Sequence, residues 1–165
     1  MTVDRGDRAV ERELIGWMHA RSTDLHGEVT LDMLIVEDNV IFRQTFKGFL
    51  RDRHPATRIE EAGDAEEAMR KIDACIPDLI FMDIKLPGMN GLQLTSVIKA
   101  RHPGIRIVVV TSLGEPELRE AALARGADGF FTKDRLNDEE FRAMLESVSS
   151  NAEVSSNELP LDHSR

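Results

Sequence analysis

Short apolar stretches alternate with amphipathic segments through the middle of this chain, and this alternation restricts its fold more than any other feature. Apolar runs cover residues 31–36, 79–82 and 105–110, a weaker strand pattern covers 57–61, and a fifth strand fits 128–132. They are too short for most helices, and the Ile- and Val-rich ones are typical of strands buried on both faces. The segments between them repeat apolar residues at helical spacing, and a last helix is expected over 137–148 with Asn137 as its N-cap. The repeated order predicts an α/β fold, a doubly wound parallel sheet of five strands with helices on both faces.

The composition excludes several classes of protein. The 165 residues carry 30 acidic against 21 basic side chains, a formal net charge of -9 that disfavours binding to nucleic acid through a general positive field. Cys75 is the only cysteine, so no internal disulfide can form, and we expect a buried, inert thiol in a cytoplasmic protein. The sequence contains no signal peptide and no apolar run near the roughly 18 residues that a membrane span requires.

Three segments are expected along the chain. Residues 31–148 form the folded domain, and residues 149–165 are polar and predicted to be disordered. Residues 1–30 form an extension that holds one amphipathic helix, whose apolar stripe consists of Val10, Leu14, Trp17 and Met18. That stripe suits packing on the chain's own domain, and it equally suits contact with a partner, including a second copy in a homodimer.

Polar side chains follow four of the predicted strands. Glu37 and Asp38 follow the first, Asp83 the third, Thr111 the fourth and Lys133 the fifth. In an open parallel sheet these ends meet at one crevice, where ligands bind. Clustered carboxylates repel one another unless they share a cation, and oxygen ligands favour Mg²⁺. Lysine and hydroxyl groups bind phosphoryl oxygens, and a carboxylate can itself be the nucleophile, so the set indicates phosphoryl transfer onto an acid.

Four motifs in this order resemble the receiver domains of two-component response regulators. They are Val36-Glu37-Asp38-Asn39, Met82-Asp83-Ile84-Lys85-Leu86-Pro87-Gly88-Met89-Asn90-Gly91, Val110-Thr111-Ser112 and Phe130-Phe131-Thr132-Lys133. The resemblance implies a flavodoxin-like (βα)5 receiver in which Asp83 accepts a phosphoryl group from a histidine kinase or phosphotransfer protein. It also implies that Glu37, Asp38, Asp83 and the backbone carbonyl of Lys85 serve a Mg²⁺ site, with Glu37 acting mainly through water.

The same resemblance implies which residues move on phosphorylation and what kind of downstream contact they control. Thr111 moves toward the phosphoryl group, Lys133 pairs with it, and the ring of Phe130 turns inward. Asp134 after Lys133, in place of the common proline, is similar to receivers that precede LuxR- or NarL-type DNA-binding domains. Only 17 residues follow Val148, however, whereas a small DNA-binding domain needs about 60. We therefore expect a stand-alone receiver that does not bind DNA directly, is not a turnover enzyme, and switches a contact with a downstream protein.

Two other classes use a similar sheet. A haloacid-dehalogenase-type phosphatase also has an aspartate nucleophile and Mg²⁺, but its general acid, two residues after the nucleophile, is replaced here by Lys85. Lysine does not deliver a proton at neutral pH as that acid does. A flavodoxin-like FMN carrier needs a Ser-, Thr- or Gly-rich phosphate loop after the first strand, where this chain has the acidic pair Glu37-Asp38.

Overall fold

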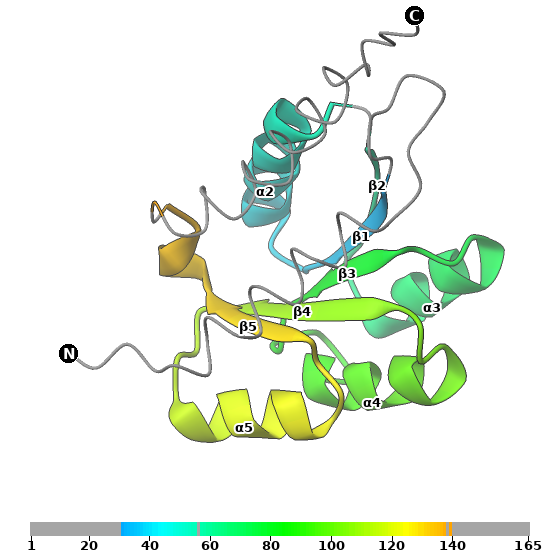
Figure 1. Ribbon diagram of the computed structural model, residues 1–165, viewed down its shortest axis with the longest axis vertical. Coiled ribbons are helices and arrows are strands. Elements are labelled where there is room, and N and C mark those ends of the chain that lie inside the picture. The colour runs from blue at the N-terminus through cyan, green and yellow to red at the C-terminus, as the bar shows by residue number, and fades with distance from the viewer. Residues whose placement is uncertain (1–30, 56, 138, 140–165) are drawn as a thin grey trace, which may run out of the picture.

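The structure, a computed structural model, describes residues 31–55, 57–137 and 139. Five parallel strands form one sheet, and helices follow the first four of them (Figure 1). The strands are β1 (Asp32–Val36), β2 (Arg58–Ala62), β3 (Leu79–Met82), β4 (Arg106–Thr111) and β5 (Gly129–Thr132). The helices are α2 (Val40–Arg53), α3 (Ala65–Ala74), α4 (Gly91–Arg101) and α5 (Pro116–Ala124), and a 3₁₀ helix spans Lys133–Asn137. The expected fold class is confirmed.

The strand order places a topological switch between β1 and β3. The order across the sheet is β2-β1-β3-β4-β5, so β1 pairs with β2 on one side and with β3 on the other. The connection that leaves β1 therefore turns one way along the sheet, and the connection that leaves β3 turns the other way. In such sheets a crevice opens at the carboxyl ends of the two strands, and this is where ligands bind.

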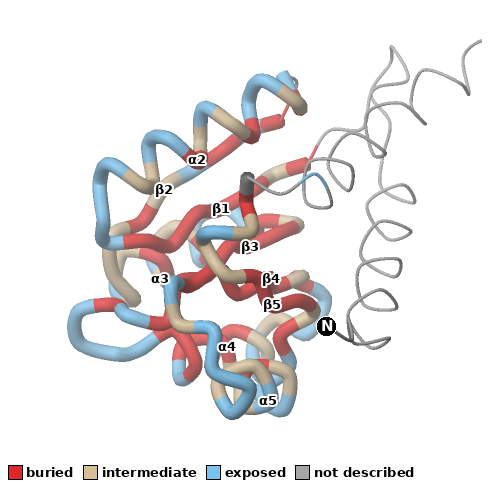
Figure 2. Tube along the Cα trace, turned by 90° about the vertical axis from the view of Figure 1, so that its left-hand side faces the viewer, coloured by how far each residue is buried: buried red, intermediate tan, exposed pale blue. Residues whose placement is uncertain are grey.

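Helices cover the sheet on both sides. In Figure 1, α2 lies on one face, whereas α3, α4 and α5 lie on the opposite face. On the α2 face Phe46 and Leu50 pack against apolar residues of β1 and β3, and on the other face Ala68, Ile72 and Ile98 pack against the alternate residues of the same strands. Figure 2 shows the central strands β1, β3 and β4 mainly as buried and the outer edge of α2 as exposed. Burial on both faces explains why these three strands are continuous apolar runs, whereas β2 at the sheet edge is not.

Side-chain caps determine where three helices begin. Asn39, Asp64 and Asn90 each accept a hydrogen bond from the backbone N–H three residues later, at the starts of α2, α3 and α4. These caps satisfy backbone donors that a first turn otherwise leaves without a partner. At the other end of α5, Gly126 adopts a φ of 99°, which glycine allows without strain and which ends the helix.

One expectation differs from the structure, and others fall outside the described residues. Cys75 is exposed, not buried, because α3 ends at Ala74 and the thiol lies on the cap residue beyond it. Asn137 is the last residue of the 3₁₀ helix, and the helix that it is predicted to cap lies largely outside the described ranges. The predicted helix over 137–148, the N-terminal helix of residues 1–30 and the tail 149–165 lie outside the described residues. Within the described ranges, no helix combines the length and the apolar character that a membrane crossing requires.

Candidate functional site

Three carboxylates meet at the crevice between β1 and β3. Glu37 and Asp38 directly follow β1, and Asp83 directly follows β3. One oxygen from each side chain lies within 4.8 Å of the others. Glu37 and Asp83 are buried, with 2% and 5% of their surface exposed, whereas Asp38 is open to solvent. The structure thus brings together the acids that the sequence places at two separate strand ends.

Backbone hydrogen bonds fix the two buried acids. The Glu37 N–H donates to the Ala62 carbonyl at 2.9 Å, and the Asp83 N–H donates to the Val36 carbonyl at 3.0 Å, so the strand pairing continues one residue past β1 and β3. On the side chains, Oε1 of Glu37 accepts from the Asn39 N–H at 2.9 Å, and Oδ1 of Asp83 accepts from the Ile84 N–H at 2.8 Å. Each carboxylate therefore has one oxygen held by the backbone and a second that faces the site.

Lys133 supplies a positive charge to the same site. Its Nζ lies 2.7 Å from Oε2 of Glu37 and 3.3 Å from Oδ2 of Asp83. The ammonium also lies over the ring of Phe42 on α2, 4.3 Å from the ring centroid. The structure thus brings Lys133 to the acids from the end of β5, with Glu37 as its closer partner.

Burial and the shared charge shift the pKa values of two of these groups. Burial raises the pKa of Glu37 from 4.5 to about 7, against the opposing effect of hydrogen bonds from Lys133 and the Asn39 N–H, while the neighbouring charge of Asp83 adds to the rise. Burial alone would lower the pKa of Lys133, but the Glu37 hydrogen bond and the Asp83 charge raise it above its ordinary value. Three clustered acids, of which only Glu37 and Asp83 contact Lys133, retain excess negative charge, which fits a divalent cation bound by hard oxygen ligands.

Two glycines shape the loop that follows Asp83, for different reasons. Gly88 has a φ of 77°, so its conformation is one that glycine adopts readily. Gly91 begins α4 against the backbone of Asp83, and a Cβ there would lie 1.8 Å from the Asp83 carbonyl oxygen. The Gly91 N–H donates to the Ile84 carbonyl at 2.8 Å, which closes the loop. The turn motif in the sequence did not predict that Gly91 approaches the backbone of Asp83 so closely. Lys85 lies exposed within this loop.

The predicted switch residues lie at neighbouring strands but do not contact the acids. Thr111 ends β4 with its side chain buried, and its Oγ1 accepts from the Leu113 N–H at 3.3 Å. Thr111 pairs in register with Thr132, the residue before Lys133. Phe130 is 8% exposed and packs in the apolar cluster on the face covered by α3, α4 and α5. The ring is therefore inward in this structure, on the side of the sheet that faces away from α2.

Two residues of α2 contact the site and were not predicted to do so. Phe42 packs under Lys133, although its position in an apolar helical pattern indicated only a core residue. Arg43 donates from Nη1 to the Glu37 carbonyl at 2.6 Å. The sequence shows Arg43 only as a basic residue five positions after Asp38, and such a spacing is too common to identify a functional residue.

Comparison with known proteins identifies the family. The model of the response regulator receiver domain matches residues 33–146. The chain is 33% identical over 101 residues to the response regulator GacA of Pseudomonas viridiflava, covering 61% of this chain and 47% of that protein. It is 32% identical over 102 residues to the nitrate/nitrite response regulator protein NarL of Escherichia coli strain K12, covering 62% of this chain and 47% of that protein. The chain therefore belongs to the response regulator receiver domain family of two-component signalling, and it spans about half the length of these curated relatives.

Solved structures agree with this assignment. A DNA-binding response regulator of the LuxR family from Staphylococcus aureus superposes with a TM-score of 0.63 at 26% identity, over 72% of this chain and 98% of that one. A two-component response regulator from Clostridium difficile gives a TM-score of 0.64 at 30% identity, over 72% of this chain and 94% of that one. The expected LuxR/NarL-type resemblance is thus confirmed, and the alternative phosphatase of haloacid-dehalogenase type finds no support.

Proposed function

We propose that Asp83 is the phosphoryl acceptor of this receiver and that a histidine kinase or phosphotransfer protein is the donor. The observation that carries this proposal is the position of Asp83, buried at the switch point within 4.8 Å of two further carboxylates and 3.3 Å from the Lys133 ammonium. A charged group at the end of a buried strand is costly without a use, and this one has an excess of like charge around it.

The transfer uses a carboxylate oxygen of Asp83 as the nucleophile. A new bond forms between that oxygen and the phosphorus of a phosphohistidine, and the phosphorus–nitrogen bond breaks. The electron pair of that bond stays on the histidine nitrogen, which then takes up a proton from solvent. No redox change occurs. Lys133 already lies between Glu37 and Asp83, so it can pair with an oxygen of the new phosphoryl group after a small movement.

Glu37, Asp38 and Asp83 would hold Mg²⁺, with the backbone carbonyl of Lys85 as a further oxygen ligand. When bound, the ion supplies positive charge that offsets the charge of the acids and of the incoming phosphoryl group. The fit depends on the donor set, since three carboxylates present oxygens within 4.8 Å and two of them are held in place by backbone N–H groups. Glu37 would act mainly through water, because its Oε2 is occupied by Lys133 at 2.7 Å.

Phosphorylation would then change the surface formed by α5, β5 and the residues that follow. The Thr111 hydroxyl would exchange its Leu113 N–H bond for the phosphoryl group, and the inward ring of Phe130 would be stabilised beneath α5. The output that we propose is a protein contact on this surface rather than direct DNA binding. In this role the chain takes part in its own phosphorylation in the cytoplasm and is not a turnover enzyme.

The direct test is phosphorylation of the Asp83→Asn variant with acetyl phosphate and Mg²⁺. We expect the wild-type chain to gain one phosphoryl group by intact-mass spectrometry and the variant to gain none, because an amide oxygen is a far weaker nucleophile than a carboxylate. Asp73→Asn is the matched control, since Asp73 is an exposed acid on α3 and its loss leaves the site intact. Persistent labelling of Asp83→Asn at saturating Mg²⁺ would refute the assignment.

A further inference from the structure

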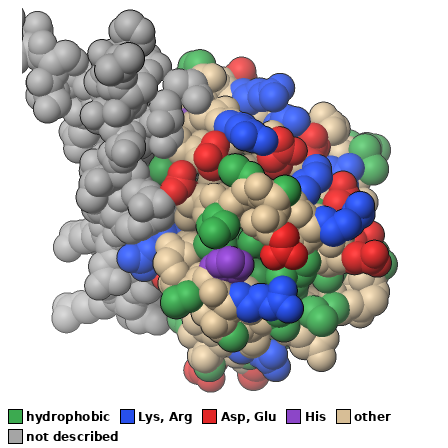
Figure 3. Space-filling model, turned by 90° about the vertical axis from the view of Figure 1, so that its right-hand side faces the viewer, with side chains coloured by type: hydrophobic (Ala, Val, Ile, Leu, Met, Phe, Trp, Pro, Cys, Tyr) green, Lys and Arg blue, Asp and Glu red, His purple; other side chains and the backbone are tan. Residues whose placement is uncertain are grey.

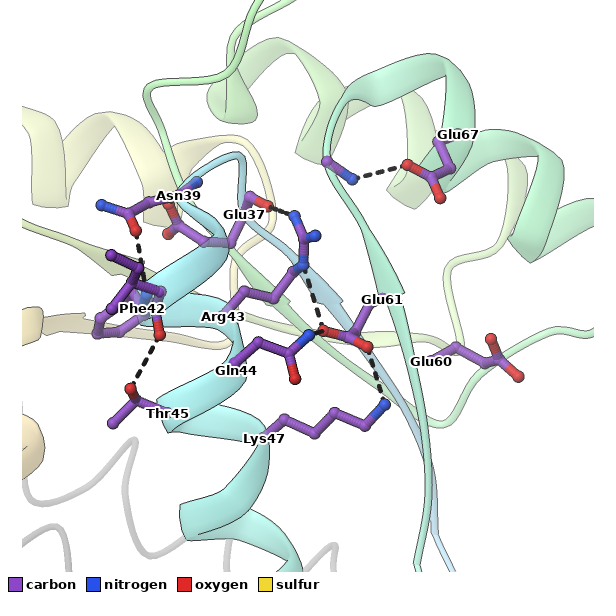
Figure 4. Close-up of polar contacts among 12 residues, drawn as sticks. Glu37, Asn39, Phe42, Arg43, Gln44, Thr45, Lys47, Glu60, Glu61 and Glu67 are labelled. Carbon is purple, nitrogen blue, oxygen red and sulfur yellow. Dashed lines mark hydrogen bonds and ion pairs between the residues drawn. The ribbon is translucent and has the colours of Figure 1, made fainter.

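We propose that Arg43 is a positioning residue for the acidic pair Glu37-Asp38. The inference rests on the proposed function, because it assigns to α2 the task of holding two of the proposed Mg²⁺ ligands. Figure 4 shows the Arg43 side chain reaching from α2 toward the Glu37 backbone on one side and toward Glu61 on the other.

The bond to Glu37 orients the peptide that joins the two acids. The Glu37 carbonyl belongs to the peptide unit between Glu37 and Asp38, beyond the last residue of β1. Nη1 of Arg43 donates to this carbonyl at 2.6 Å, a charge-assisted hydrogen bond. Rotation of that peptide would redirect the Asp38 side chain, which is exposed and forms no hydrogen bond or ion pair with the described residues. The guanidinium therefore restricts where Asp38 can point.

Glu61 on β2 holds the guanidinium in place. Nε of Arg43 lies 3.2 Å from Oε1 of Glu61, and the same carboxylate accepts from Gln44 at 2.8 Å and from Lys47 at 2.8 Å (Figure 4). Burial alone would raise the pKa of Glu61, but the hydrogen bonds and charges of Lys47 and Arg43 lower it below the ordinary value. Glu61 is therefore an ionised anchor on a strand that the sheet fixes.

A planar guanidinium suits this arrangement better than an ammonium would. Arg43 bridges two acceptors, the Glu37 carbonyl and the Glu61 carboxylate, from two different nitrogens. Lysine is a point charge that cannot present two donors in a fixed fork. The chain of contacts runs from β2 through Glu61 and Arg43 to the peptide of the acidic pair, so α2 supports the site as well as covering the sheet.

Lys47 offers a matched control. It contacts the same Glu61 carboxylate at 2.8 Å, and its side chain is 18% exposed against 17% for Arg43, but it makes no recorded contact with Glu37. Arg43→Gln and Lys47→Gln therefore remove the same charge from the same anchor, and only the first releases the peptide of the acidic pair. Arg43→Lys keeps the positive charge but loses the pair of guanidinium donors that reach Glu37 and Glu61 together.

The test uses the full chain and has two readouts. By calorimetry with Mg²⁺ alone, we expect Arg43→Gln to weaken binding by about tenfold or more, as loss of an outer-shell partner does, and Lys47→Gln by less than about twofold. In metal-free protein, hydrogen exchange of the Asn39 amide, which donates to the Glu37 carboxylate, should accelerate in Arg43→Gln and not in Lys47→Gln. Arg43→Lys should fail to restore either property.

Three results would overturn the inference: equal effects of the two Gln variants, full rescue by Arg43→Lys, or unchanged Asn39 exchange in Arg43→Gln. Circular dichroism verifies that each variant is folded, and Arg43→Lys replaces Arg43→Gln in both readouts if the latter does not fold. A wild-type chain that neither binds Mg²⁺ nor accepts a phosphoryl group would refute the proposed function instead. The exchange comparison in metal-free protein would then still decide the role of Arg43.

Discussion

The two ends of the sheet differ in how their acidic side chains are paired. At the end where the strands begin, one acid, Asp128, has several donors, whereas at the end where the strands finish several acids share one base. Asp128 accepts from Lys99 at 2.8 Å, from Arg106 at 2.9 Å and from the Ile107 N–H at 2.9 Å. Figure 3, which faces this end, shows acidic and basic side chains interspersed over its surface. At the other end three carboxylates lie together, and one lysine, Lys133, contacts two of them, Glu37 and Asp83. Charge that serves the structure is fully paired, whereas charge that awaits a ligand is left in excess.

Asp128→Ala should produce the largest loss of stability among the changes considered for this comparison. The substitution leaves Lys99 and Arg106 without their shared carboxylate and the Ile107 N–H without its acceptor. Hydrogen bonds to charged groups contribute about 2 kcal/mol, so we expect the free energy of unfolding in urea to fall by about that amount. Mg²⁺ binding should be unchanged, because Asp128 lies at the opposite end of the sheet.

Asp73→Ala is the reference for this measurement, since it removes an exposed acid of the same kind. If Asp128→Ala costs no more than Asp73→Ala, the amino end does not depend on paired charge, and the contrast between the two ends disappears.

Asp38→Asn tests the acids at the carboxyl ends of the strands. We expect this substitution to increase the free energy of unfolding, by less than Asp128→Ala decreases it. Asp38 is exposed beside two like charges and pairs with no recorded base among the described residues. In metal-free buffer the variant should be more stable by up to about 1 kcal/mol, because repulsion between charges about 4 Å apart in water has that size. Mg²⁺ affinity should fall at the same time. A clear loss of stability would show that the native fold uses the Asp38 charge, and the cluster would then be structural.

The sequence alone was sufficient to predict the positions of the strands and the acids that follow them. Strands buried on both faces are continuous apolar runs, and an ionised side chain directly after such a run stands out, as Asp83 does after Leu79–Met82. The joint position of Glu37 and Asp83 followed from the rule that carboxyl ends of parallel strands share one edge.

Residues that act through the rotation of a helix could not be predicted in the same way. Arg43 and Phe42 are adjacent on α2, and which of them reaches the Glu37 carbonyl or the Lys133 ammonium depends on how the helix is rotated against the sheet. The spacing of apolar residues predicts which face of the helix is buried, but it does not predict the exact rotation of the helix about its axis. The wrong prediction for Cys75 has a related cause, because a shift of one residue at a helix end turns a side chain from core to solvent.

His54 allows the smallest of these tests, which uses pH. It caps the end of α2, its ring is buried, and its Nε2 finds no hydrogen-bond partner among the described residues. Burial, followed by the charge of Arg53, lowers the pKa of His54 below 6.5, its value in the unfolded chain. Below pH 6.5 the unfolded chain binds more protons than the native one. The stability contributed by the neutral ring is thus present above pH 6.5 and is lost as the pH falls through the folded pKa.

The measurement compares urea unfolding of wild type and His54→Phe at about pH 7.5 and about pH 5.5, without Mg²⁺. We expect the wild type to lose more stability between these pH values, because the carboxylates titrate in both chains and cancel in the difference. His102→Phe is the control, since His102 caps α4 with nearly the same backbone angles, φ -134° and ψ 72° against -132° and 69°, and has a half-buried ring. If His54→Phe retains the whole pH dependence, protonation of the His54 ring does not destabilise the fold, and the proposed role of its buried, neutral state is wrong.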